Sequence, residues 1–316
     1  MSLRRYVLKR LLVTVPVLIG VTLITFGMVH LIPGDPIDFI TLFTELDPAV
    51  EAEIRAQYGL DQPIYIQYVD WLVDAIQLDF GRSIVTQRPV VAEIADRLPF
   101  TLLMGSMAFV VAILVAIPSG IVAAYYRNTK IDEFSRVFAL FGVAMPNFWL
   151  GLIFLLVFSS WLGIFPFLPP TDNGLWSIKM IVYTILPAVT IGTGSAALLM
   201  RLMRSSMVEE LDKDYVKLAR AKGLTERTIV RKHILRNSLI SVVTVAAIQI
   251  AFIISGSVVV EVVFSYPGVG RLLVNRVSAR DFPIIQALVL LIGITVITAN
   301  LAADIVYGYL DPRIRY

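Results

Sequence analysis

The chain has 316 residues, of which 57% are hydrophobic and only 16% are charged, with a mean hydropathy of +0.79. Soluble domains carry about 25% charged residues, so this composition excludes an ordinary soluble protein. The absence of cysteine excludes disulfides, thiolate catalysis and thiolate metal sites. His30 and His233 are too far apart in sequence to suggest a metal centre, and a net charge of +3 is too small to indicate a nucleic-acid partner.

Six apolar runs are long enough to cross a bilayer, which requires about 20 mostly apolar residues per helix. Buried strands of soluble α/β proteins are also apolar, but they extend over only about 4–8 residues. The sequence therefore predicts an all-α polytopic membrane protein with six transmembrane helices. In chain order the expected spans are Leu11–Leu31, Phe100–Tyr125, Phe134–Trp161, Met180–Met200, Leu239–Val263 and Ile284–Tyr307.

The first run could be confused with a secretory signal peptide, because Arg4, Arg5, Lys9 and Arg10 precede it. A signal peptide has an apolar core of about 7–15 residues and a cleavage site of small residues behind it. This run is longer, and it is followed by His-Leu-Ile-Pro-Gly-Asp-Pro, residues 30–36, without such a site. We interpret it as a retained helix.

Lysine and arginine gather in cytoplasmic loops, so their distribution predicts the orientation. With the N-terminus inside, 19 of the 27 basic residues fall in inner segments and 8 in outer segments. Both termini are therefore expected in the cytoplasm. The predicted regions are the N-terminus with the first span, an extracytoplasmic loop region, a five-helix core that includes a cytoplasmic loop at 201–238, and a cytoplasmic tail, over residues 1–31, 32–99, 100–310 and 311–316.

The outer region 32–99 is acidic, with 12 acidic against 4 basic residues, and it carries helix signals. Asp47 is a candidate N-cap, Pro48 suits the first helical position, and Gly59 suits a helix end. A second helix is predicted after Pro63, because one apolar stripe follows at helical spacing: Ile64, Tyr68, Trp71, Leu72 and Ala75. These helices either cap the bundle near the membrane interface or contact a substrate or its carrier.

The spans contain very few ionisable residues, and the exceptions, His30, Glu261 and Asp304, lie near helix ends. Ion-coupled transporters need a titrating or ion-binding cluster deep in the membrane, so this pattern disfavours them. Three amides are the candidates for a translocation path: Asn147, Gln249 and Asn300. The alternative is ordinary hydrogen bonding between helices. Pro118, Pro146 and Pro187 lie within spans, either as packing features or as hinges.

The most basic inner segment lies between the fourth and fifth spans, over residues 200–240. A stripe at helical spacing, with Ala219 beside it, predicts a short helix that Gly223 ends: Leu211, Tyr215, Leu218 and Lys222. Thr225 is expected to cap another helix that runs to about Arg236. From periodicity alone these two amphipathic helices could lie on lipid, on the bundle, or in the groove of a soluble partner.

The segment between the last two spans, Phe264–Arg280, holds a tight turn followed by a basic stretch. Tyr266, Arg271 and Arg276 are its candidates for an outer gate or a binding-protein contact. The alternative is an interfacial loop that Phe264 and Tyr266 anchor.

The string Tyr-Val-Lys-Leu-Ala-Arg-Ala-Lys-Gly-Leu, residues 215–224, followed by His-Ile-Leu-Arg-Asn at 233–237, resembles the coupling loop of binding-protein-dependent ABC importer permeases. The general motif of that superfamily is Glu-Ala-Ala, three residues, Gly, nine residues and Ile-x-Leu-Pro. It is matched poorly, with Lys217, Leu218 and Ala219 at the first three positions and His233 and Arg236 at the Ile and Pro positions. The match is to the variant in peptide and nickel permeases.

The resemblance extends over nearly the whole chain and is greatest to the B-type permease subunits of dipeptide and oligopeptide importers. Further motifs occur in the family's order: Leu-Ile-Pro-Gly-Asp-Pro at 31–36, the run at 58–72, Asp-Phe-Gly-Arg-Ser at 79–83, Met-Pro-Asn-Phe-Trp-Leu-Gly at 145–151, the run at 261–273, Arg-Asp-Phe-Pro at 280–283 and Leu-Asp-Pro-Arg-Ile-Arg near the C-terminus.

The resemblance implies a type I importer fold in the bacterial or archaeal cell membrane, with the helix from Leu211 to Gly223 in a groove of an ATPase subunit. Lys217, Arg220 and Lys222 could pair with acidic groups of that partner, although cytoplasmic loops are basic in any case. The implied partners are a similar second permease chain, two ATPases and an extracytoplasmic substrate-binding protein. The chain has no Walker A string. It is therefore expected to be non-catalytic and to hold no cofactor, with ATP and Mg bound by the ATPases.

Two other classes remain to be weighed. A stand-alone secondary transporter or channel would transport without an ATPase, which the coupling-loop motif disfavours. A membrane-embedded protease would need a Ser–His pair, two membrane aspartates or a histidine-rich metal site, and the sequence shows none of these. Within the importer class the expected cargo is a dipeptide or oligopeptide, with nickel or an oligosaccharide as the alternative.

Overall fold

The computed structural model describes residues 3–31, 61–170 and 174–310. Every extended regular element within these ranges is a helix, and an isolated bridge pairs Arg82 with Pro89. The elements in chain order are α1 (Leu3–Leu31), α4 (Ile64–Ile76), α5 (Val90–Tyr125), α6 (Lys130–Ala144), α7 (Asn147–Phe154), η1 (Leu155–Trp161), α8 (Ile178–Leu211), α9 (Asp214–Ala221), α10 (Glu226–Ile229), η2 (Val230–Ile234), α11 (Leu235–Val263), α12 (Val269–Ser278) and α13 (Phe282–Leu310).

Five of the described helical segments are long and apolar enough to cross a membrane, and a bent pair makes six if it counts as one span. The third apolar run, predicted over Phe134–Trp161, is not one continuous helix. It is broken between α6 and α7 and bent by 104°. Met145 is extended, with ψ at 126°, because a proline follows it and disfavours the helical region for the preceding residue. Pro118 and Pro187 lie inside α5 and α8 without ending them.

The spans are longer than hydropathy alone predicts. α5 has 36 residues and begins ten residues before Phe100, and α8 has 34 and continues to Leu211. At 1.5 Å per residue each helix is about 50 Å long, whereas the hydrocarbon core is about 30 Å thick. Both helices therefore extend well beyond the membrane.

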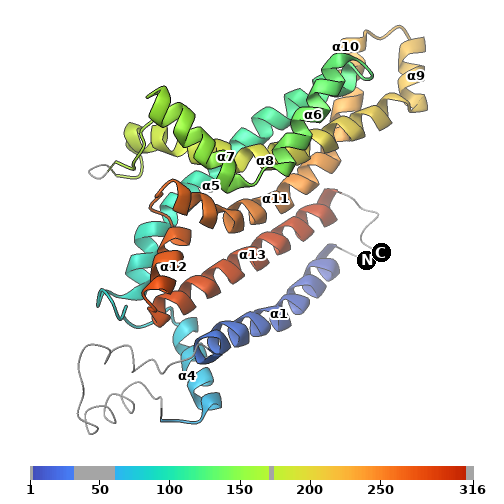
Figure 1. Cartoon of the computed structure of the whole chain (residues 1–316). Coiled ribbons are helices and arrows are strands. Elements are labelled where there is room, and N and C mark those ends of the chain that lie inside the picture. Colours follow the sequence, from blue (N-terminus) through green and yellow to red (C-terminus); the bar gives the residue numbers. More distant parts are fainter. Residues whose placement is uncertain (1–2, 32–60, 171–173, 311–316) are drawn as a thin grey trace.

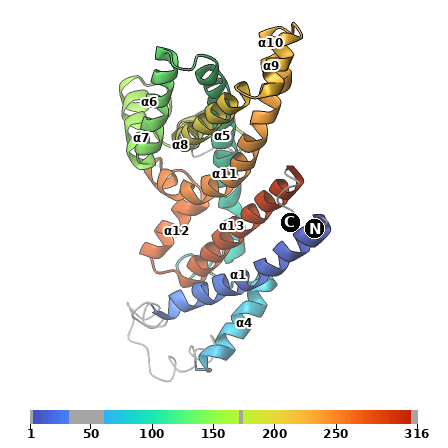
Figure 2. The same ribbon diagram turned by 90° about the vertical axis from the view of Figure 1, so that its right-hand side faces the viewer.

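The helices lie side by side in a tilted bundle in which α5 and α8 make the most extensive contact (Figure 1). α11, α13 and α1 follow outward, so that α1 packs mainly on α13 (Figure 2). α9 and α10 lie at one end of the bundle, here called the α9 end, and α12 and α4 lie at the other, the α12 end. α1 begins and α13 ends toward the α9 end.

Small side chains let α5 approach α8 closely, as is usual between membrane helices. Ala112, Ala116 and Ala123 of α5 are fully buried in the largest apolar cluster. A Cβ on Gly120 would lie 2.7 Å from the Cβ of Met203 on α8, so this crossing has room only for glycine. The same cluster reaches into α9 and η2, and therefore connects the bundle core to the α9 end.

The predicted helix after Pro63 is confirmed as α4. Its inward stripe packs on α1, where Tyr68 and Trp71 contact the ring of Phe26, and the hydroxyls of Tyr68 and Thr22 are 2.8 Å apart. α4 therefore caps the bundle, as one of the two interpretations held. The helix expected from Asp47 to Gly59 lies outside the described residues.

Candidate functional site

α9 is a separate helix that follows α8 after a short break. Leu211, expected on this helix, is instead the last residue of α8. The buried strip of α9 overlaps the predicted stripe only in part: Val216 and Ala219 are 0% and 7% exposed, whereas Leu218 is 57% exposed. Val216 and Ala219 join the apolar cluster of the bundle. α9 therefore packs on the bundle through one side of the helix, and Leu218 lies on the opposite, exposed side.

The outward face of α9 combines Leu218 with exposed cations. Lys217 pairs with Asp214 at 2.8 Å, and Arg220 pairs with Glu226 at 2.6 Å. Exposed pairs of this kind contribute about 0.2–1 kcal/mol, so a partner's carboxylates could replace the internal ones at little cost. Lys222 is exposed on the same helix as its C-cap.

Gly223 ends α9, as predicted, because its φ is +76°, a conformation that side chains with a Cβ rarely adopt. The Gly223 N–H donates to the carbonyl of Arg220 at 2.9 Å, and the Leu224 N–H donates to that of Ala219 at 3.3 Å. A Cβ on Gly223 would meet nothing within 4 Å. The backbone conformation of the turn, not space, requires glycine here.

The second predicted loop helix is not a separate element. It begins after Thr225, as expected, although the Thr225 side chain makes no capping hydrogen bond to the backbone, and α10 passes through the π-helical η2 into α11 without a break. No glycine or proline occurs between Thr225 and Gly256 to interrupt it. The loop is therefore one short helix, a glycine turn and the extended start of the fifth span.

A polar cluster ties α9 to its two neighbours. Glu210 of α8 accepts hydrogen bonds from the Tyr215 hydroxyl and from Lys213, the latter at 2.6 Å. Asn237 of α11 donates to the Tyr215 oxygen at 3.1 Å. Burial, followed by the hydrogen bond to Glu210, raises the pKa of Tyr215. Sequence reasoning named Tyr215 but missed Glu210; Asn237 was visible only as part of the His-Ile-Leu-Arg-Asn string.

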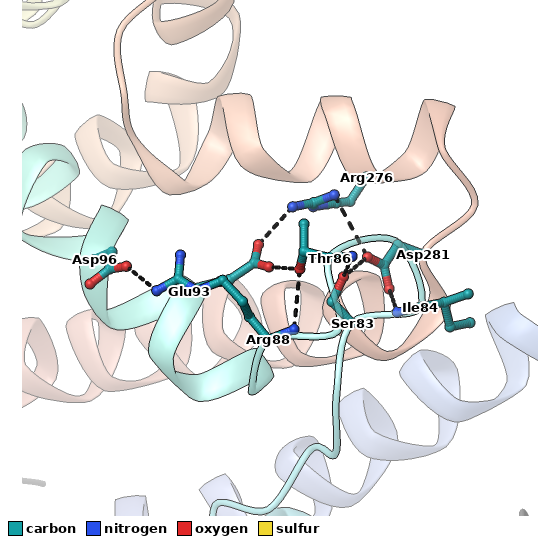
Figure 3. A network of polar contacts seen from close by, with 8 residues as sticks. All are labelled: Ser83, Ile84, Thr86, Arg88, Glu93, Asp96, Arg276 and Asp281. Carbon is teal, nitrogen blue, oxygen red and sulfur yellow. Dashed lines mark hydrogen bonds and ion pairs between the residues drawn. The ribbon is translucent and has the colours of Figure 1, made fainter. Parts of the chain in front are cut away.

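At the α12 end, a buried network joins the turn 79–89 to the α12–α13 junction (Figure 3). The Ser83 hydroxyl donates to Asp281 at 2.5 Å, and the Ile84 N–H donates to the same carboxylate at 3.1 Å. Arg276 lies 2.8 Å from Glu93 and 3.8 Å from Asp281. The structure thus brings together the motifs at 79–83 and 280–283, whose Ser83 and Asp281 are 198 positions apart. The Arg276 side chain forms ion pairs with carboxylates of the same protein.

Another buried carboxylate, Glu261, holds the beginning of α12. It accepts hydrogen bonds from the Thr101 hydroxyl at 2.7 Å and from the Arg271 N–H at 2.9 Å. Thr101 in turn accepts the Val269 N–H at 2.9 Å. A carboxylate at a helix N-terminus satisfies free N–H groups and the helix dipole. A Cβ on Gly268 would overlap this carboxylate, which explains the glycine.

Tyr266 is not at a lipid interface, so the interpretation of this segment as an interfacial loop is wrong. Its side chain is 0% exposed, and its hydroxyl is 3.0 Å from that of Thr184 and donates to the Phe100 carbonyl at 3.2 Å. Burial raises the pKa of Tyr266 to about 12. Phe264 is also buried. Neither side chain is available for direct contact with a binding protein in this conformation.

The three candidate path amides lie on three different helices. Asn147 begins α7 against Gly194 of α8, and Gln249 is half-buried on α11. Asn300 lies in a groove of 180 Å³ between α1 and α13, beside Arg10 and Asp304. No hydrogen bond joins the three amides in the part of the chain that the structure describes. Asn300 lies on the side of α13 that faces α1.

Two families match adjoining parts of the chain. Residues 116–316 match the family described as binding-protein-dependent transport system inner membrane component, and residues 3–105 match the N-terminal component of such membrane proteins. The network of Figure 3 joins residues from both parts.

Curated relatives match nearly the full length. The chain is 43% identical over 311 residues to the glutathione transport system permease protein GsiC of Escherichia coli (strain K12), covering 98% of this chain and 99% of that one. The Salmonella typhimurium protein of the same name matches equally well.

Solved structures share the fold at lower identity. The methionine ABC transporter MetNI, in inward-facing conformations, gives a TM-score of 0.52 at 19% identity over 67% of this chain and 93% of that one. An amino acid ABC transporter gives 0.55 at 13% identity over 69% and 94%. The chain therefore belongs to the binding-protein-dependent transport system inner membrane components, and it is a multi-pass inner membrane permease subunit of an ABC importer.

Proposed function

We propose that this permease imports dipeptides, oligopeptides or peptide-like compounds and that α9 couples it to ATP hydrolysis. The observation that carries the coupling role is the division of α9 into a buried strip and an outward face. Val216 and Ala219 attach the helix to the bundle, and Leu218 remains exposed beside cations. An amphipathic helix presented in this way suits a groove on a soluble partner.

The α9 end is the cytoplasmic end in this proposal, because the loop at 201–238 carries 10 of the 27 basic residues. The outward face of α9 would enter an ATPase groove through Lys217, Leu218, Arg220 and Lys222, with Gly223 setting the turn. Leu211, Tyr215 and Ala219 would hold the helix to the bundle. The beginning of α1 and the end of α13, which lie toward this end, would be cytoplasmic as well.

The complex would contain a second, homologous permease chain, two ATPase subunits and a substrate-binding protein at the α12 end. ATP and Mg would be bound by the ATPases, and this chain would hold no cofactor. The relatives named for glutathione transport support a peptide-type cargo, since glutathione is a tripeptide. Asn147, Gln249 and Asn300 are the path candidates, with Asn300 in the groove beside α1.

The α12 segment would act as an outer gate through its position and not through free cations. Arg276 is held by Glu93 and Asp281, and the Arg271 side chain donates to the Ser265 carbonyl. Tyr266 fixes the turn from inside the bundle. Contact with a binding protein would fall to the exposed face of α12, which includes Val274 and Val277.

The test of the coupling role is Gly223→Val in the complex purified with its natural partners. A β-branched residue is strained at a φ of +76°, so the turn after α9 should change. We expect the ATPases to copurify while substrate-stimulated ATP hydrolysis is lost. Retained stimulation would refute the coupling role of this turn.

The test of cargo uses the partner binding protein as isolated from cells. Mass spectrometry of the ligand that it retains should identify a peptide or a γ-glutamyl compound. Retained nickel or an oligosaccharide would overturn the peptide assignment and leave the coupling role intact. Transport by this chain reconstituted alone, without an ATPase, would overturn the coupling role.

A further inference from the structure

Asp132 is the charged residue that ties the bent span to the base of the α9 loop. It lies in the first turn of α6 and is 0% exposed. Arg204 of α8 contacts it with two nitrogens, at 2.5 and 2.7 Å, in the forked geometry of a strong guanidinium–carboxylate pair. The Asn128 N–H donates to the same carboxylate at 3.0 Å, and Arg136 lies 3.6 Å from it.

A second ion pair connects the same turn to α9. Arg127 follows α5 and contacts both oxygens of Asp212, at 3.0 and 3.1 Å. Asp212 lies at the break between α8 and α9. The turn 126–129 is therefore held from both sides, by a buried pair to α8 and by an exposed pair to the beginning of the α9 loop.

These contacts matter because α6 has no continuous helical connection to the rest of its span. The break at Met145 and the bend of 104° mean that no continuous helix backbone couples α6 to α7. Its contacts with α8 farther along are apolar and close, as where Gly142 meets Ala197. Apolar contacts resist separation but are not directional, whereas a forked ion pair fixes the register of two helices.

We propose that Asp132 and Arg204 are positioning residues that make α6 follow the α9 loop, so that a push on α9 turns the bent span as well. The Arg127–Asp212 pair supports them at the loop itself. This inference rests on the proposed coupling role of α9. In this arrangement the displacement divides between α6, through Arg204, and α11, through the Glu210–Tyr215–Asn237 cluster.

A merely structural role makes a different prediction. Replacing one partner of a buried pair leaves an unpaired charge and destabilises the fold, whereas removing both charges is often tolerated. The informative variant is therefore the double substitution Asp132→Asn with Arg204→Met, which leaves no buried charge at this position. Arg204→Lys is its conservative counterpart, because it keeps the charge and loses only the fork.

The experiment measures ATP hydrolysed per substrate taken up, in proteoliposomes that contain the full complex and its binding protein. For the double variant we expect this ratio to rise roughly threefold or more, in the range over which single changes alter coupling. Arg204→Lys should stay within about twofold of the wild type. Arg88→Ala is the matched control, because it removes an exposed pair with Asp96 at the α12 end and should leave the ratio unchanged.

A second measurement needs no transport. The chain has no cysteine, so spin labels can be placed by Phe134→Cys on α6 and Glu209→Cys at the end of α8, both exposed. The distance between the labels should stay constant with and without ATP in the wild type and change with ATP in the double variant. A wild-type ratio and a constant distance in the double variant would overturn the inference. A wild-type complex without ATP-dependent uptake would instead refute the proposed function.

Discussion

The α9 loop and the α12 network both depend on carboxylates, but the carboxylates lie in different surroundings. Asp212, Asp214 and Glu226 pair with cations at the protein surface around α9. Glu93, Glu261 and Asp281 are 5%, 0% and 0% exposed at the α12 end. An exposed pair exchanges partners at little cost, whereas breaking a buried one is expensive. The proposed docking role of α9 requires this difference: the α9 end could exchange its exposed pairs for a partner's charges, whereas the α12 end satisfies its own carboxylates internally.

The largest effect is expected for Glu261→Ala at the α12 end. The change leaves the Thr101 hydroxyl and the Arg271 N–H buried without their acceptor, and each such group costs about 1–3 kcal/mol. Thermal unfolding of the purified complex should show a clear fall in midpoint. Glu133→Ala, an exposed carboxylate of α6, is the control and should leave the midpoint in place. Equal midpoints for the two variants would contradict the structural role of Glu261.

A smaller loss of stability is expected for Gly268→Ala. The new methyl group would overlap the Glu261 carboxylate, and overpacking of this kind costs about 1–3 kcal/mol. Gly174→Ala is the matched control, since a Cβ there meets nothing within 4 Å. Denaturant or thermal unfolding of both variants measures the difference. A Gly268→Ala protein as stable as the control would mean that the carboxylate can move aside.

Leu218→Asp tests the exposed face of α9, at the α9 end. Leu218 is 57% exposed, and surface substitutions usually change stability by less than about 0.5 kcal/mol. The unfolding midpoint of the permease should therefore be preserved, while the amount of ATPase that copurifies should fall. Val216→Asp should instead lower the unfolding midpoint of the permease, because Val216 is fully buried. Unchanged copurification with Leu218→Asp would remove this residue from the docking face.

The smallest effect concerns the pH dependence of Asp212. The hydrogen bond from Arg127 lowers the pKa of this carboxyl, so the pair contributes stability above the ordinary pKa of about 3.9. That contribution is lost as the pH falls through the lowered value. The midpoint difference between the wild type and Asp212→Asn should be small at neutral pH and vanish in acid. A midpoint difference that grows in acid would contradict the lowered pKa of Asp212.

Hydropathy and charge were enough to predict most of the fold. The composition predicted the spans, and α4 and the Gly223 turn followed from local patterns. The break at Met145 could not be singled out from the three prolines, because Pro146 has the same local signature as Pro118, which lies inside a continuous α5. Hydropathy windows also stop where polar residues begin, so they could not show that α8 continues to Leu211.

The candidate site was predicted only in part. Helical periodicity located α9 but could not show which residues of its stripe face the bundle: Tyr215 and Ala219 do, whereas Leu218 does not, because α9 starts anew after Asp212. The Ser83–Asp281 and Asp132–Arg204 contacts join residues that are 198 and 72 positions apart. Pairings over such separations depend on how the helices are arranged, and a single sequence does not contain that information.

The unbroken length of α8 has a mechanical consequence. A rigid rod about 50 Å long amplifies rotation, so that a tilt of about 5° about one end moves the other by about 4 Å, a little less than one helical turn. α8 holds the Tyr183–Tyr266 stack near its beginning and leads directly to α9 at its end. A modest tilt of α8 about either end would therefore displace its other end by about the width of a side chain.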